Sequence, residues 1–134
     1  MLTAKTSEIV DTFAVIQKIG DLPALKLSWR IGKIARRLQP IYEQFRTDEL
    51  ALYKTYGKEK VAGGGNWEVL PGNFTEFDGE RKILLDKKVE VDIEPIPLGL
   101  FDFAPDPKYP DAKYQVPPLM FSVMGWIIEE TVSN

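Results

Sequence analysis

The sequence predicts an α+β fold in which a long, kinked helix packs in a helical hairpin or bundle and a small antiparallel β-sheet covers one end. Two patterns carry this prediction: a long apolar stripe with helical spacing over residues 22–57, and a strictly alternating segment over residues 88–96. The length of 134 residues, with 44% apolar and 28% charged residues, suits one domain of an ordinary globular protein.

The first predicted helix spans residues 7–19. Thr6 or Ser7 is expected to cap its first turn, and Gly20 fits its end. Because only Gly20 and Asp21 separate it from the next helical pattern, the first two helices are expected to be antiparallel neighbours. Its apolar face repeats every three or four residues, through Ile9, Phe13 and Ile16.

The second predicted helix is the long one, residues 22–57. Pro40 lies inside it, and an interior proline removes a hydrogen bond and crowds the preceding turn. We therefore expect a kink near Arg36 to Pro40, with a break into two helices as the alternative. The apolar stripe is close to a heptad seam, interrupted only near Asp48, and comprises Leu27, Ile31, Ile34, Leu38, Ile41, Phe45, Leu52 and Tyr56.

The middle of the chain has mixed signals. Residues 58–65 include three successive glycines and are expected to form a mobile loop. The apolar run in residues 66–70 favours a short strand. Asn73 is then expected to cap a third helix, with Glu76 completing a capping box, and this helix is expected to run to about Lys87.

Residues 88–96 alternate between apolar and acidic side chains, which predicts a half-buried strand that pairs with residues 66–70. The buried face would carry Val89, Val91 and Ile93, and the other face Glu90, Asp92 and Glu94. A row of carboxylates could hold a divalent ion or perform acid–base chemistry. The simpler interpretation is the solvent-facing side of an antiparallel strand, and we favour it.

The last third begins with an arm rich in proline and aromatic residues, residues 101–118, followed by a C-terminal helix over residues 119–130. The aromatic side chains of the arm could be anchors for a protein partner, or they could fold back on the core; both interpretations stay open. They are Phe101, Phe103, Tyr109 and Tyr114. With a hairpin over 1–57 and a loop–strand–helix–strand unit over 58–100, these segments are expected to form one domain.

The composition limits the chemistry that the chain can perform. It contains no cysteine and no histidine, which excludes thiolate chemistry and any Ser-His-Asp triad. The triple glycine lacks the Lys-Ser or Lys-Thr that a phosphate-binding loop requires. We therefore expect a protein that is not an enzyme and holds no cofactor or metal. No signal peptide or membrane-spanning segment is expected either, which favours the cytoplasm.

The first half of the long helix carries a basic face. Its cations recur at four, three and four residues and comprise Lys26, Arg30, Lys33 and Arg37, with Arg36 beside them. This face could bind phosphates or an acidic protein. The alternative is a solvated helix face that pairs with the protein's own carboxylates, and charge runs more often have this explanation.

The order of several segments resembles a family of small uncharacterised proteins of tailed phages and prophages. The resemblance spans residues 12–130 and rests on LPALKLSWRIGKIARRLQPIYEQF, YGKE, GNFTEFDGE, LLDKKVEVDIEPIPL and the final IIEE. It implies a helical hairpin with a small β part and no assigned reaction. The segment 103–118 looks like an addition to the family pattern.

These observations together predict a non-enzymatic phage protein whose work is protein–protein contact, as a virion assembly factor or minor structural component. One alternative is a protein that binds and inhibits a host enzyme, such as a polymerase or a defence nuclease. Another is a nucleic-acid-binding protein that uses the basic face. The partner would be a phage structural protein or a host enzyme, with a homo-oligomer open, and no membrane is involved. The expected location is the host cytoplasm, with incorporation in the virion open.

Overall fold

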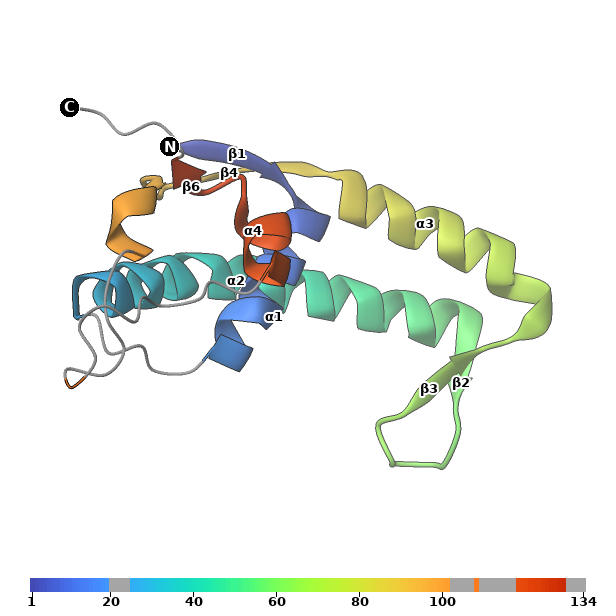
Figure 1. Cartoon of the computed structure of the whole chain (residues 1–134). Helices are drawn as coiled ribbons and strands as arrows, with labels where there is room; N and C mark the ends of the chain where they lie inside the picture. Colours follow the sequence, from blue (N-terminus) through green and yellow to red (C-terminus); the bar gives the residue numbers. More distant parts are fainter. Residues whose placement is uncertain (20–24, 102–107, 109–117, 130–134) are drawn as a thin grey trace.

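The computed structural model describes residues 1–19, 25–101, 108 and 118–129, and it has the predicted α+β architecture (Figure 1). None of its described helices is both long enough and apolar enough to cross a membrane. In chain order the elements are β1 (Leu2–Lys5), α1 (Thr6–Ile19), α2 (Leu25–Tyr56), β2 (Gly57–Glu59), β3 (Trp67–Val69), the 3-10 turn η1 (Pro71–Asn73), α3 (Phe74–Asp86), β4 (Lys88–Val91), β5 (Ile96–Pro97), the 3-10 turn η2 (Leu98–Phe101), α4 (Pro118–Met124) and β6 (Ile128–Glu129).

Helix α2 is one uninterrupted helix that includes Pro40. The alternative of a break into two helices is therefore wrong. The stripe is buried on both sides of the proline, at Leu38 and at Phe45, while Pro40 itself lies on the exposed side. Packing of both flanks offsets the hydrogen bond that the proline ring removes.

The core lies along the first half of α2, which packs directly against α1 (Figure 1). Helix α4 and the strands β1, β4 and β5 contribute further buried residues to it, such as Met124, Ala4, Val91 and Ile96. Thr12 joins two of these helices, because its buried hydroxyl accepts a hydrogen bond from the Trp126 indole at 2.9 Å and donates to the Val123 carbonyl at 3.3 Å. The apolar residues that α1 and α2 contribute to this core belong to the predicted stripes: Ile9, Phe13, Ile16, Leu27, Ile31, Ile34 and Leu38.

The strand pairing differs from the prediction. Strand β3 pairs with β2, and β4 pairs with β1, so residues 66–70 and 88–96 are not partners. Both true partners are too short for periodicity to identify them. Gly57 permits the β2–β3 pair, because a β-carbon there would overlap the Glu68 backbone. A third pair, β5 with β6, is parallel.

The predicted loop 58–65 is partly strand. β2 continues to Glu59, and β2 and β3 form a hairpin whose tip contains the three glycines. Gly63 and Gly65 have φ of +77° and +76°, a conformation that residues with a β-carbon rarely adopt. The Gly65 N–H donates to the Glu59 carboxylate at 3.3 Å, which helps to close the tip.

Two residues that were predicted to cap helices instead form hydrogen bonds between different elements. Thr6 is already helical, and its hydroxyl donates to the Lys87 carbonyl at 2.9 Å. Asn73 does precede α3, but its side chain makes no cap hydrogen bond and donates instead to the Tyr56 carbonyl at 3.2 Å. Neither carbonyl lies near in sequence, so local patterns could not identify these bonds.

The C-terminal helix is shorter than predicted. It ends at Met124 rather than at residue 130. The chain then turns, and β6 pairs with β5 with Ile128 opposite Ile96. Ile127 and Ile128 are both buried there, which explains why their apolar character resembled a continued helix stripe.

The gap in the α2 stripe near Asp48 is filled by a carboxylate. Glu49 follows Phe45 by one turn, and its side chain is only 11% exposed. The Arg81 guanidinium of α3 donates to it at 2.9 Å, and Arg46 lies 3.5 Å away. This ion pair joins the second half of α2 to α3.

We predict that Arg81→Ala lowers the free energy of unfolding by about 1–3 kcal/mol, because it leaves the Glu49 carboxylate buried with a weaker partner. Glu49→Leu, which extends the apolar stripe, is expected to change it by less than about 1 kcal/mol. Urea denaturation followed by circular dichroism measures both. Arg46→Ala, at an exposed side chain, is the control. A larger loss in Glu49→Leu than in Arg81→Ala would contradict this account.

A hydrogen bond at the end of α2 makes the stability of the fold depend on pH. The Tyr56 hydroxyl donates to the Glu80 carboxylate at 3.0 Å. This bond, followed by partial desolvation and by the charges of Glu80 and Glu76, raises the pKa of Tyr56 above its ordinary value of 10.0. Because the pKa is raised in the folded state, the stability from this bond is present below pH 10 and is lost as the pH rises through the folded-state pKa.

We predict that Glu80→Gln lowers the pKa of Tyr56 toward its ordinary value, because the amide carries no charge. Absorbance titration of the tyrosinate band measures this, with Tyr56→Phe identifying the contribution of Tyr56. Glu90→Gln, at an exposed site on β4, is the control and is expected to titrate as the wild type does. An unchanged titration in Glu80→Gln would show that the bond is absent in solution.

Candidate functional site

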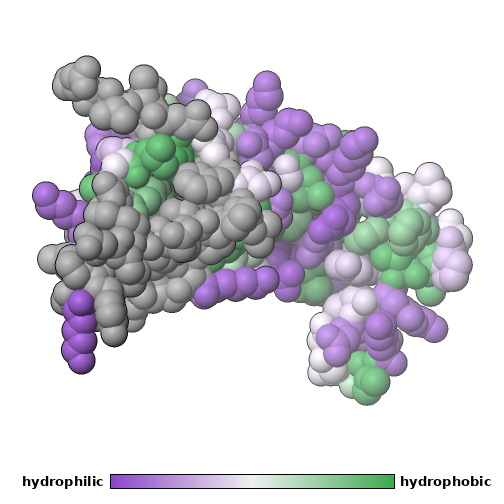
Figure 2. All heavy atoms as spheres, viewed as in Figure 1, coloured by the Kyte–Doolittle hydropathy of each residue, from purple (hydrophilic) through white to green (hydrophobic). Residues whose placement is uncertain are grey.

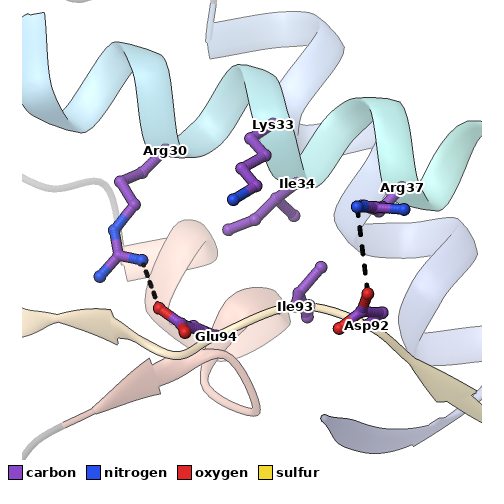
Figure 3. Close-up of a pocket in the computed structure, with 7 residues that line it drawn as sticks. All are labelled: Arg30, Lys33, Ile34, Arg37, Asp92, Ile93 and Glu94. Atoms are coloured by element: carbon purple, nitrogen blue, oxygen red, sulfur yellow. Dashed lines mark hydrogen bonds and ion pairs between the residues drawn. The ribbon is translucent and has the colours of Figure 1, made fainter.

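The predicted basic face and the predicted carboxylate row lie opposite each other. In Figure 3 the cations of α2 point across a shallow pocket toward the segment that follows β4. Arg30 lies 3.3 Å from Glu94, and Arg37 lies 3.9 Å from Asp92. Residues 92 and 94 are exposed, as the alternation predicted.

These pairs change what the basic face can do. Exposed ion pairs contribute about 0–1 kcal/mol to stability, so their effect on the fold is small. Their effect on the surface charge is larger, because two of the four predicted cations face a carboxylate of the same chain. Lys26 and Arg36 have no ion pair within the described part of the chain.

A tryptophan that the prediction did not single out stands among these cations. Trp29 is 60% exposed, and the Lys33 ammonium lies 5.4 Å from its ring. It occupies the outer side of α2, between the buried stripe residues Leu27 and Ile31. An aromatic residue off the stripe and between cations was the signal in the sequence that could have identified it.

Trp29 borders an open groove of about 550 Å³, which we call the Trp29 groove. One wall comes from α2 and the other from β5 and η2, which pack against the first turns of α2. The lining is mostly apolar, with two cationic side chains at its edge. The described residues that line it are Lys26, Trp29, Arg30, Pro97 and Leu100.

One predicted aromatic anchor is wrong. Phe101 closes η2 and is only 5% exposed, because it packs in the core with residues such as Ile96. The alternative of an aromatic folded back on the core is correct for this residue. Phe103, Tyr109 and Tyr114 lie outside the described residues.

The described residues contain no group of three or more acidic side chains placed to hold a metal ion. The two carboxylates at the pocket each form an ion pair with a cation of α2, Glu94 with Arg30 and Asp92 with Arg37 (Figure 3).

We predict that Asp92→Asn with Glu94→Gln makes the protein elute from heparin at higher salt than the wild type, because Arg30 and Arg37 become available. Arg30→Ala with Arg37→Ala is expected to elute earlier. The control is Glu76→Gln with Asp78→Asn, which changes the net charge equally at the far end of the molecule. Identical elution of the control and the first variant would mean that the basic face is no separate polyanion site.

Comparison with known proteins does not place this chain in a family. No family model, curated protein or solved structure matches this chain. The proposals below are therefore argued from the residues and their geometry.

Proposed function

We propose that this chain is a non-enzymatic protein-interaction protein that binds a protein partner at the Trp29 groove. The observation that carries the proposal is the exposed Trp29 ring beside an apolar groove with cations at its edge. Tryptophan and arginine are enriched among the residues that dominate binding energy at protein interfaces.

The groove is held in a fixed shape before any partner arrives. Trp29 lies in α2 two residues after Leu27, which is fully buried and fixes this part of the helix to the core. The opposite wall is anchored by Ile96 and Phe101, which are also in the core. A rigid aromatic surface loses little conformational entropy on binding, so more of the contact energy becomes affinity.

The chemistry of the groove indicates which side chains a partner would present to it. Its floor suits an apolar side chain, and burial of a large one contributes about 1.5–3 kcal/mol. Its edge carries Lys26 and Arg30, with Lys33 over the Trp29 ring. A segment with an exposed apolar residue flanked by carboxylates complements this edge, and salt would slow its association.

The resemblance to small phage proteins supplies the proposed setting, which is virion assembly or a minor structural component in the host cytoplasm. The absence of histidine and cysteine supports a role without catalysis. Inhibition of a host enzyme is the rival, because the same groove could bind a host protein. Nucleic-acid binding is less well supported, because Arg30 and Arg37 face carboxylates of the same chain.

We expect Trp29→Ala to abolish capture of the partner while leaving the fold intact, since the ring is mostly exposed. Wild type, Trp29→Ala and the control Leu50→Ala are used as baits in lysate of the cells that produce the particles, and the captured proteins are identified by mass spectrometry. Wild type and control should retain a particle protein that Trp29→Ala loses.

Each other outcome contradicts a different part of the proposal. Equal capture by all three baits would show that the groove is not the binding site. A stoichiometric host enzyme that only Trp29→Ala loses would support the inhibitor role and remove the assembly role. Absence of the protein from purified particles would remove the structural-component role.

A further inference from the structure

We propose that the Trp29 groove accepts the far end of a second copy of this chain, so that copies associate head to tail. We call that end the distal tip and define it by Leu70, Phe74, Glu76 and Asp78. The inference rests on the proposed function, because it assigns an occupant to the same groove.

The distal tip presents apolar side chains to solvent. Leu70 is 38% exposed and Phe74 is 60% exposed. The inward-facing aromatic of this turn is Phe77, whose ring centroid lies 4.8 Å from that of Tyr53, so Phe74 is left outside. Figure 2 shows apolar side chains gathered at this end, where α3 begins.

The exposure follows from the architecture. Tyr42 still stacks on Phe13 of α1, but the last turns of α2 pack mainly against α3 and the β2–β3 hairpin within the described chain (Figure 1). So thin a layer cannot cover all its apolar side chains. Most of the large exposed apolar residues of the described chain therefore lie in this half: Leu50, Val61, Leu70, Phe74 and Ile83.

The two ends differ in charge. Residues 25–42 carry five cations, of which Arg30 and Arg37 are paired with Glu94 and Asp92. Residues 61–80 carry four carboxylates and no cation, and Glu68 among them is paired with Lys58. At the distal tip Glu76 and Asp78 have no ion pair within the described part of the chain. Asp78 follows Phe74 by one helical turn, so the tip presents an apolar side chain with a carboxylate beside it, which complements the apolar lining and the Lys26 cation of the Trp29 groove.

The two surfaces cannot meet within one copy. The groove borders the first turns of α2, whereas the tip is tied to the last turn by the Asn73–Tyr56 hydrogen bond. The 32 residues of α2 span about 48 Å at 1.5 Å per residue. Filling the groove therefore requires a second copy. Such a contact joins two different surfaces, so it propagates into a filament or closes into a ring.

The test uses analytical ultracentrifugation of the full chain over a wide concentration range. The wild type is expected to gain mass with concentration and to lose that gain in high salt, because charge complementarity contributes. Trp29→Ala and Phe74→Ala are each expected to weaken self-association at least tenfold. Ile83→Ala, at an even more exposed apolar site on α3, is the control and should behave as the wild type does.

A mixture of the two variants tests whether the contact between copies is head to tail. Phe74→Ala retains an intact groove and Trp29→Ala an intact tip, so an equimolar mixture should form a dimer that neither variant forms alone. That dimer cannot grow, because its free groove and free tip are the mutated ones. Failure of the mixture to dimerise would overturn the head-to-tail contact.

Two further outcomes separate this inference from the proposed function. A wild type that stays monomeric at every concentration would overturn the inference. The proposed function would survive that result if Trp29→Ala still loses a captured partner. If copies associate through the groove while all baits capture the same proteins, the inference stands and the proposal of a foreign partner at the groove fails.

Discussion

The burial of the α2 stripe is the constraint on which the rest of the structure depends. This helix has 32 residues and is longer than the core that packs around it. Its first half is buried by α1, α4 and the short strands, while its second half extends beyond them to α3 and the hairpin (Figure 1). Because α2 continues through Pro40, a single helix joins two different ends of the molecule. We call the end that contains the core the thick end, and the end where α2 lies beside α3 and the hairpin the thin end.

The two ends are stabilised by different forces. At the thick end, apolar side chains from distant segments form one buried cluster, with the hydrogen bonds of Thr12 beside it. At the thin end, polar interactions join α2 to its neighbours, through Glu49 with Arg81 and Tyr56 with Glu80. The thin end buries fewer apolar side chains, so part of its apolar surface is exposed and available to a partner.

The exposure of individual side chains was predicted better than their partners were. The alternation over residues 88–96 correctly placed Val91 inside and Asp92 outside. The pairing of that strand was wrong, since its partner is β1 rather than residues 66–70. Alternation depends on one local periodicity, whereas pairing is a choice among several short segments whose sequences carry almost no signal.

The sequence by itself determined the first three helices, the α2 stripe, the basic face and the absence of histidine and cysteine chemistry. These depend on spacing and composition, which the chain contains locally. Only the tertiary structure decided that Phe101 is buried, that Arg30 and Arg37 face carboxylates, and that Trp29 borders a groove. Each of these depends on where η2 and the segment after β4 pack against α2. That placement is set by contacts between residues far apart in the chain, so no local pattern could specify it.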